Sequence, residues 1–199
     1  MEIKLGKMAE IIASGGKHVL YGPNGGGKSS MLTMAIIKIS SVSAYANEVG
    51  LKGLKGLKLN NKTCVWPFDV EKVRFRKPFS VRCPQLQDVP PFKLYYDHAY
   101  KNGMWIQISK LSYGERKYIA LSVAAKWLGE IVASDSHLII ENLESGLDPE
   151  MTKKLLELIA SFPNLHAAVE MHSPNLVETA VKLGFTVYYV KDFTARRVV

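Results

Sequence analysis

Nine residues near the N-terminus, 22–30, read GPNGGGKSS. They follow an apolar run at 18–21 that is typical of a buried strand, and they precede an apolar run at 31–37 that is typical of a helix. Glycines let a main chain turn tightly and let an anion approach its N–H groups, and the N-terminus of a helix favours negative charge. A strand, a glycine-rich turn and a helix in this order predict an α/β fold built around a phosphate-binding loop.

The same nine residues fit the pattern G-x-x-x-x-G-K-[ST], in which the main chain holds the phosphates of a nucleoside triphosphate. In that pattern the lysine ammonium contacts the outer phosphates and the serine hydroxyl binds Mg²⁺. A glycine-rich surface turn is the alternative interpretation, and the strand before it and the helix after it argue against that alternative. We therefore expect the nucleotide to contact Gly22, Pro23, Asn24, Gly25, Gly26, Gly27, Lys28, Ser29 and Ser30.

The composition is that of a globular protein: of 199 residues, 47% are hydrophobic and 22% are charged. This length favours a single domain spanning residues 1–199. No apolar run reaches the roughly 20 residues of a membrane-spanning helix, and the first residues do not resemble a signal peptide, so we expect a cytoplasmic protein. Cys64 and Cys83 are too few and too far apart to indicate a disulfide framework or a zinc site.

The formal net charge is +8, and basic surfaces are common in proteins that bind nucleic acid. Residues 50–62 read GLKGLKGLKLNNK, where glycine at every third place disfavours a helix and favours a flexible basic loop. Its lysines would suit the phosphate backbone of DNA, but they would equally suit a solvated connector. Evenly scattered lysines would also explain the charge, so the sequence leaves a DNA partner open.

The remaining pattern alternates helices with strands, which predicts a mostly parallel sheet with helices on both faces. The periodicity predicts that the helix after the glycine-rich loop extends past 40 toward 48. The other predicted helices cover 5–14, 115–132, 149–161 and 175–183, and the other predicted strands cover 63–68, 73–76, 79–82, 104–108, 138–140, 167–171 and 186–190.

Weaker patterns follow the loop along the chain. Ser112 and Glu115 have the spacing of a capping box at a helix N-terminus, and capping alone would explain both residues. Glu141 ends an apolar strand, the position at which a nucleotide-hydrolysing enzyme holds Mg²⁺. Asp148 is the predicted N-cap of the next helix, and His172 ends a later strand. Each pattern is weak alone, but their order after a phosphate-binding loop is informative.

In this order the segments resemble those of the ATP-binding-cassette ATPases. The stretch LSYGER at 111–116 is similar to the signature LSGGQ, and IIENLESGLD at 139–148 is similar to LLDEPTSGLD. VRCPQ at 81–85 resembles the family's segment that ends in the Q-loop glutamine, and MHS at 171–173 resembles its switch-histidine segment. The resemblance covers residues 17–190 and implies a P-loop ATPase with a reduced helical lobe.

The resemblance also implies roles for residues around the nucleotide. Gln85 would sense the γ-phosphate and touch Mg²⁺, Glu141 would bind Mg²⁺, and His172 would contact the γ-phosphate. Asn142 stands where the family carries a catalytic glutamate, and an amide cannot accept a proton from water. Glu144 is the other nearby acid in the sequence, so it is either a substitute base or an exposed turn residue. We expect ATP hydrolysis that is slow.

The family sandwiches two ATP molecules between two copies of the chain. The resemblance therefore implies an ATP-dependent homodimer, in which Ser112 and Gly114 of one copy complete the nucleotide site of the other and Asp148 links the two sites. Tyr113 replaces a glycine that lies close to the partner's phosphates, so this contact is expected to differ from the family pattern.

The glutamate and basic residues at 115–117 and the histidine–serine pair at 172–173 look most like DNA-repair and chromosome-maintenance ATPases and the ATPase domains of overcoming-lysogenization-defect nucleases. This resemblance implies an ATP switch in DNA maintenance or defence, with a separate effector protein. The alternatives are the ATPase subunit of an ATP-binding-cassette transporter and a regulatory module with almost no turnover. DNA binding would favour the first function, and co-purification with a membrane subunit would favour the transporter.

Overall fold

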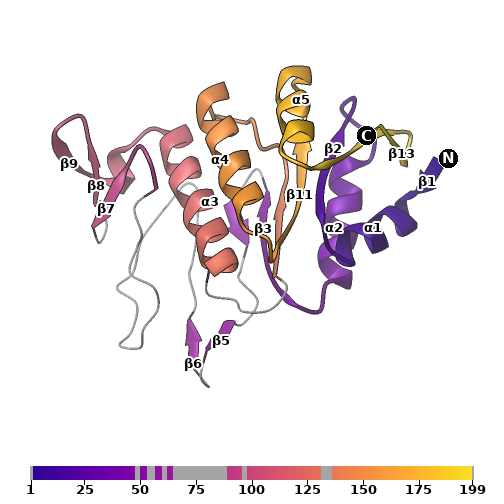
Figure 1. The fold of residues 1–199 in the computed structure, drawn as a ribbon, viewed down its shortest axis with the longest axis horizontal. Coiled ribbons are helices and arrows are strands. Elements are labelled where there is room, and N and C mark those ends of the chain that lie inside the picture. Colours follow the sequence, from indigo (N-terminus) through magenta and orange to yellow (C-terminus); the bar gives the residue numbers. More distant parts are fainter. Residues whose placement is uncertain are drawn as a thin grey trace.

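The computed structural model describes residues 2–47, 50–52, 57–59, 62–64, 89–95, 98–130 and 136–198. Within these ranges an eight-stranded sheet runs through the molecule (Figure 1). Its central strands are parallel, and antiparallel strands extend both edges. In spatial order the strands are β1 (Glu2–Lys4), β13 (Thr194–Arg197), β12 (Thr186–Lys191), β2 (Lys17–Tyr21), β11 (Leu165–Met171), β10 (Ser136–Ile140), β3 (Val42–Asn47) and β4 (Gly50–Lys52).

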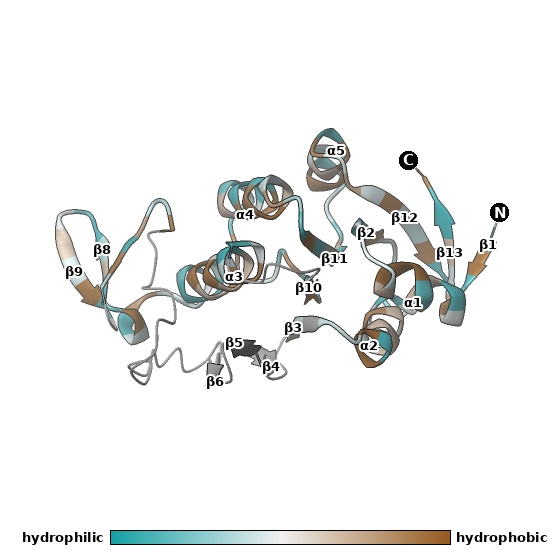
Figure 2. Ribbon diagram, turned by 60° about the horizontal axis from the view of Figure 1, so that its bottom comes forward, coloured by the Kyte–Doolittle hydropathy of each residue, from teal (hydrophilic) through white to brown (hydrophobic). Residues whose placement is uncertain are grey.

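Helices cover the sheet on both faces, as Figure 2 shows. The helices α1 (Leu5–Ala13) and α2 (Lys28–Lys38) lie on one face, and α3 (Tyr113–Glu130), α4 (Pro149–Ser161) and α5 (Pro174–Lys182) lie on the other. Side chains alternate between the two resulting cores, so Ala167 and Val169 of β11 pack with α3–α5 while Ala168 packs with α1 and α2. The predicted α/β fold with a mostly parallel sheet is confirmed.

The register of the parallel strands determines which loops meet. Tyr21, the last residue of β2, pairs with Met171, the last residue of β11, and β10 ends two positions earlier because Ile140 pairs with Val169. Parallel strands bring their carboxyl ends to the same edge of a sheet, and ligands bind at that edge. The glycine-rich loop and the segments that begin at Glu141 and His172 therefore meet there.

Smaller sheets lie beside the main one. β5 (Leu57–Leu59) and β6 (Lys62–Cys64) form an antiparallel pair, and β7 (Lys93–Tyr95), β8 (His98–Lys101) and β9 (Met104–Gln107) form an antiparallel three-stranded sheet. A short 3₁₀ helix, Ile108–Lys110, connects this second sheet to α3. The strand predicted at 104–108 is thus confirmed to within one residue.

The prediction for the segment after the glycine-rich loop was wrong. The helix α2 ends at Lys38, and β3 begins at Val42 and pairs with β10, next to the edge strand β4. The sequence pattern changes there from helical to alternating: Ala44 and Ala46 pack toward α3–α5, while Tyr45 packs toward α1 and α2. Pairing with a central strand outweighed the helical periodicity that continues from α2.

The basic segment 50–62 was predicted as a loop, but its described parts are the strands β4 and β5 together with the first residue of β6. The strands predicted at 73–76 and 79–82 lie outside the described residues. Edge strands β1 and β13 were not predicted, because they are short and rich in charged residues. Among the helices that the structure describes, none is long and apolar enough to cross a membrane.

Candidate functional site

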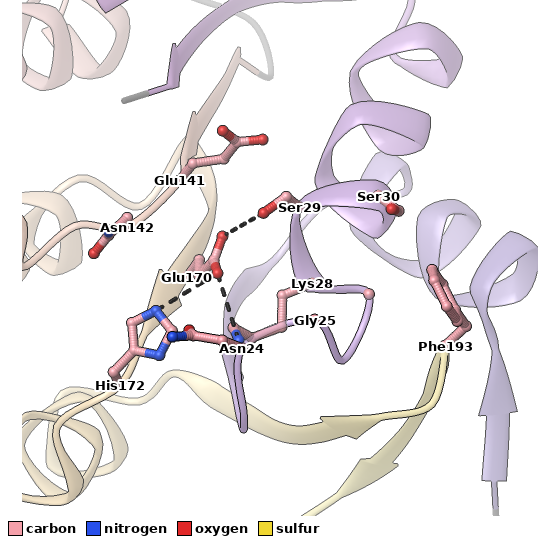
Figure 3. Close-up of a pocket in the computed structure, with 11 residues that line it drawn as sticks. Asn24, Gly25, Lys28, Ser29, Ser30, Glu141, Asn142, Glu170, His172 and Phe193 are labelled. Atoms are coloured by element: carbon pink, nitrogen blue, oxygen red, sulfur yellow. Dashed lines mark hydrogen bonds and ion pairs between the residues drawn. The ribbon is translucent and has the colours of Figure 1, made fainter. Parts of the chain in front are cut away.

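A cavity of about 570 Å³ opens at the carboxyl edge of the sheet, between the glycine-rich loop and the ends of β10 and β11 (Figure 3). Its size lies within the range of small-molecule sites. Backbone, lysine, hydroxyl, carboxylate, imidazole and aromatic groups all face it. The lining residues are Asn24, Gly25, Gly27, Lys28, Ser29, Ser30, Glu141, Asn142, Glu170, His172 and Phe193.

The glycine-rich loop has the shape that the motif requires. Gly27 has a φ of 101°, a left-handed conformation that favours glycine, and α2 begins at the next residue. A Cβ atom at Gly27 would lie 2.7 Å from the Phe193 ring. The loop is closed by a hydrogen bond from the Gly26 amide to the Pro23 carbonyl (3.3 Å). Unpaired amides at the start of α2 and the helix dipole make this end of the cavity suited to an anion.

Lys28 is held inside the loop with only 3% of its surface exposed. Its ammonium donates to the carbonyls of Gly22 (2.9 Å) and Pro23 (2.8 Å), and it lies 3.5 Å from a carboxylate oxygen of Glu170. A buried ammonium needs such partners, because an unpaired buried charge is costly. Phosphate oxygens could replace the two carbonyls as acceptors, since a lysine side chain has several rotatable bonds.

Glu170 is the residue that the sequence analysis missed. It lies on β11, one residue before the strand ends, with 7% of its surface exposed. The Ser29 hydroxyl donates to it (3.0 Å), and the His172 ring lies 3.6 Å away (Figure 3). A signal was present in the sequence: a single carboxylate interrupts the apolar run of a buried parallel strand.

Glu141 also lies in the cavity, at the end of β10 as predicted. Its carboxylate accepts a hydrogen bond from the Tyr45 hydroxyl, which lies 3.4 Å from the Thr33 hydroxyl on α2. Burial and the hydrogen bond to Glu141 raise the pKa of Tyr45 to about 12, so the phenol stays protonated and donates near neutral pH. In Figure 3 Glu141 lies above Glu170, and a dashed line joins Glu170 to Ser29.

Asn142 follows with a φ of 43°, in the left-handed region that asparagine tolerates better than most residues. Lys117 of α3 is buried and donates to the carbonyls of Asn142 (2.9 Å) and Ser145 (2.7 Å), which fixes the turn. The Leu143 amide donates to the Glu170 carbonyl (3.0 Å), so this turn is also tied to β11. Asn142 itself lines the cavity beside Glu141.

Glu144 is used by the neighbouring loop. Its carboxylate accepts hydrogen bonds from the amides of His172 (3.1 Å) and Ser173 (2.9 Å), at the N-terminus of α5. Glu144 is not among the residues that line the cavity in the described part of the chain, whereas His172 is. The structure therefore shows Glu144 fixing the loop that carries His172.

The signature-like segment lies at the start of α3, outside the cavity. Ser112 and Glu115 form the predicted capping box, since the Ser112 amide and hydroxyl donate to Glu115 (3.0 and 2.8 Å) and Lys101 pairs with the same carboxylate. Burial raises the pKa of Glu115, but the bonds from Lys101 and Ser112 outweigh it and leave that pKa below its ordinary value. A Cβ atom on Gly114 would lie 1.9 Å from the Gly146 carbonyl, so the two loops pack directly together.

Ser112 and Asp148 are both exposed at the residue level. The Asp148 side chain caps α4 by accepting from the Met151 amide (2.8 Å), as predicted. Neither residue lines the cavity of its own copy within the described ranges. Gln85 lies outside the described residues.

The residues in the cavity fit a nucleoside triphosphate with Mg²⁺. The loop offers amides and an ammonium to phosphates, and Ser29, Glu141 and Glu170 offer oxygen atoms of the kind that Mg²⁺ prefers. In the described part of the chain, no group of three or more His, Cys, Asp or Glu side chains is arranged to hold a metal ion by itself.

Comparison with known proteins supports this assignment. Residues 47–178 match the model of a family described as "AAA domain, putative AbiEii toxin, Type IV TA system". The matched range is more than half of the chain and contains Glu141, Asn142 and His172, while the glycine-rich loop precedes it. A search of curated proteins found no match. The chain therefore belongs to this family of AAA-type P-loop ATPase domains.

Proposed function

We propose that the chain binds ATP with Mg²⁺ in this cavity, hydrolyses it slowly, and uses the bound ATP to bring two copies together. The observation that carries the proposal is the arrangement of the cavity. A left-handed glycine, a buried lysine and the start of α2 form one wall, and the carboxylates of Glu141 and Glu170 form another. Cation and amide groups on one side and acids on the other suit a triphosphate whose charge is partly offset by Mg²⁺.

The chemistry of each residue in the cavity suggests its role toward ATP and Mg²⁺. Amides of residues 25–30 would hold the phosphates, and the Lys28 ammonium would move from the carbonyls of the loop to the outer phosphates. Ser29 would bind Mg²⁺ through its hydroxyl, and Glu141 would act on the same ion from β10. A Mg²⁺ ion held by these residues would supply positive charge that offsets the charge developing on the phosphates. His172 would contact the γ-phosphate from the end of β11.

Slow hydrolysis follows from the residue at position 142. Asn142 lines the cavity, and its amide can orient a water molecule without accepting a proton. A positioned general base contributes about 10² to 10⁴ in rate, so its absence slows turnover by that order. Glu144 is a weak substitute, because its carboxylate is engaged by the amides of His172 and Ser173. The chain would then spend most of its cycle with ATP bound, as a switch requires.

Dimerisation is proposed from the exposed surface beside the cavity. Ser112 and Asp148 are exposed, and the loops that carry them pack together through Gly114 and Gly146. These two loops would together cover the ATP of a second copy, in the head-to-tail manner of ATP-binding-cassette ATPases. ATP would serve as part of the interface, so association would depend on nucleotide.

The proposed cellular role rests on the net charge of the chain and on the groups of ATPases that its motifs resemble. A net charge of +8 favours weak, sequence-independent DNA binding, and the motifs resemble DNA-maintenance and overcoming-lysogenization-defect ATPases. We propose a single-domain cytoplasmic ATPase in DNA maintenance or defence that acts with a separate effector protein. Recovery of the chain with a membrane subunit would instead favour the role of a transporter ATPase.

Titration of the protein with a fluorescent ATP analogue and Mg²⁺ tests the proposed function. Lys28→Ala should lower the affinity by about 10- to 100-fold, because it removes a charged hydrogen bond to phosphate. Lys38→Ala is the matched control, since Lys38 lies at the other end of α2 and outside the cavity, and it should bind as the wild type does. Equal affinity of wild type and Lys28→Ala, with both proteins folded, would contradict the assignment of the loop.

A further inference from the structure

In the ATP-binding-cassette pattern the metal-binding carboxylate is the one at the end of β10, here Glu141. In this structure a second carboxylate, Glu170 on β11, lies next to the serine of the phosphate-binding loop. The hydroxyl of Ser29 and a carboxylate oxygen of Glu170 are 3.0 Å apart. Two oxygens that bind adjacent positions of an octahedral Mg²⁺ ion, each at about 2.1 Å, are about 3 Å apart. The hydrogen bond between Ser29 and Glu170 therefore has the spacing of two ligands of one ion.

Glu141 has a competing partner. The Tyr45 hydroxyl donates to its carboxylate, and Tyr45 lies on β3, on the side of β10 away from β11. Glu170 is instead surrounded by groups of the nucleotide site itself, namely Ser29, the Lys28 ammonium (3.5 Å) and the His172 ring (3.6 Å). The two acids thus have different hydrogen-bond partners: Glu170 accepts from Ser29 at the end of the phosphate-binding loop, and Glu141 accepts from Tyr45 on β3.

From these contacts we infer that Glu170 is the carboxylate that shares Mg²⁺ with Ser29. Glu141, whose carboxylate is oriented by Tyr45, would then act on the ion from the end of β10. The inference rests on the proposed function, because it assigns a ligand to the Mg²⁺ that accompanies ATP. It also explains why a charged residue interrupts the apolar strand β11 at this one position.

The test measures how binding of a non-hydrolysable ATP analogue depends on Mg²⁺. Glu170→Gln keeps the size of the side chain and removes its charge. The Mg²⁺ concentration that gives half of the maximal increase in affinity for the analogue should therefore rise about 10- to 100-fold. Binding of the analogue without metal, in a chelating buffer, should not weaken, because one negative charge near the phosphates is gone. Mn²⁺ as a paramagnetic probe should show a matching loss of affinity in titrations followed by electron paramagnetic resonance.

Glu178→Gln is the matched control, because Glu178 lies on α5, is exposed and is outside the cavity. Glu170→Asp keeps the charge on a shorter side chain and should give an intermediate shift, which covers the case that Glu170→Gln does not fold. An unchanged Mg²⁺ dependence in Glu170→Gln would overturn the inference and leave Glu170 as a structural counter-ion of Lys28. If the proposed function itself is wrong, the wild type will bind no nucleotide with or without Mg²⁺. That result differs from an unchanged Mg²⁺ dependence in Glu170→Gln, and it would also overturn the inference.

A different observation concerns the hairpin between β12 and β13. Its turn residues Asp192 and Phe193 have left-handed φ values of 48° and 58°, and the Phe193 amide donates to the Gly26 carbonyl (2.9 Å). The hairpin is thereby attached to the phosphate-binding loop. Phe193 lines the cavity, yet 54% of its surface is exposed. In Figure 3 its ring stands beside the loop, on the side away from Glu141 and His172.

The geometry points to Phe193 as the residue on which the nucleotide base stacks. Phosphates at the loop and Mg²⁺ near Ser29 would fill the acidic side of the cavity, so the base would extend to the other side, where this ring is. The main-chain hydrogen bond fixes the backbone of Phe193 beside the loop, and its exposed ring offers a flat apolar surface to a base. A stacked base contributes enough to change affinity by about 5- to 150-fold.

Binding of ATP and of inorganic tripolyphosphate, which has no base, separates this role from an effect on the loop. Phe193→Ala should weaken ATP binding by about 5- to 150-fold and leave tripolyphosphate binding unchanged, while Phe193→Trp should retain ATP affinity. Tyr95→Ala, which removes an exposed aromatic side chain on β7, is the control and should change neither. Unchanged ATP affinity in Phe193→Ala, or equal losses for both ligands, would overturn the assignment.

Discussion

Replacing Asn142 with glutamate should accelerate ATP hydrolysis and slightly destabilise the fold. A carboxylate at this position of the cavity would accept the proton of the attacking water, which is worth about 10² to 10⁴ in rate, or roughly 3 to 5 kcal/mol of barrier. The φ of Asn142 is 43°, and glutamate would adopt that conformation at a cost of roughly 1 to 2 kcal/mol. Because the backbone strain opposes correct placement of the carboxylate, we expect a gain near the lower end of the range. The ATP-bound dimer should be correspondingly short-lived.

Single-turnover hydrolysis measures the chemical step, and urea unfolding measures the strain. Asn142→Gln is the matched control, since it has the length of glutamate and the same backbone cost but cannot accept a proton. It should unfold like Asn142→Glu and hydrolyse no faster than the wild type. If Asn142→Glu is no faster than Asn142→Gln while Glu144→Gln loses nearly all activity, the base is Glu144. If the wild type is already fast and none of these changes matters, our account of hydrolysis is wrong.

Three further predictions follow from other parts of the chain. Ser112→Arg should leave ATP binding intact and prevent the ATP-dependent doubling of mass in light scattering; a doubling that persists would exclude Ser112 from the interface. Glu144→Ala should lower the free energy of unfolding in urea by about 2 to 3 kcal/mol, because two amides lose a charged acceptor, and a loss below about 0.5 kcal/mol would contradict this role. Replacing Lys52, Lys55 and Lys58 together with alanine should weaken DNA binding and reduce its salt dependence; unchanged binding would make residues 50–62 a connector.

The glycine-rich loop and the parallel core could be predicted from the sequence because their physical requirements are local. Gly27 must adopt a left-handed conformation, and the apolar runs of β2, β10 and β11 fit strands that are buried on both faces. The capping box of Ser112 and Glu115 and the N-cap Asp148 also depend only on neighbouring residues. These elements appear in the structure close to where the sequence placed them.

What the sequence did not reveal depends on contacts between distant residues. Glu170 lies 141 positions after Ser29, and its importance arises only when β11 is inserted between β2 and β10. Phe193 similarly becomes part of the cavity because β12 pairs with β2 and carries its hairpin to the loop. The strand β3 was mistaken for a helical extension because its pairing with β10 overrides local propensity.

A crystal structure with a non-hydrolysable ATP analogue and Mg²⁺ tests the central claim most directly. The account predicts density for the triphosphate along the glycine-rich loop, with the Lys28 ammonium moved from the carbonyls of Gly22 and Pro23 to the phosphates. It also predicts the metal ion in contact with Ser29 and a second copy of the chain over the nucleotide. An empty cavity at millimolar ligand, with Lys28 still bound to both carbonyls, would contradict the claim that this chain is an ATP-binding switch.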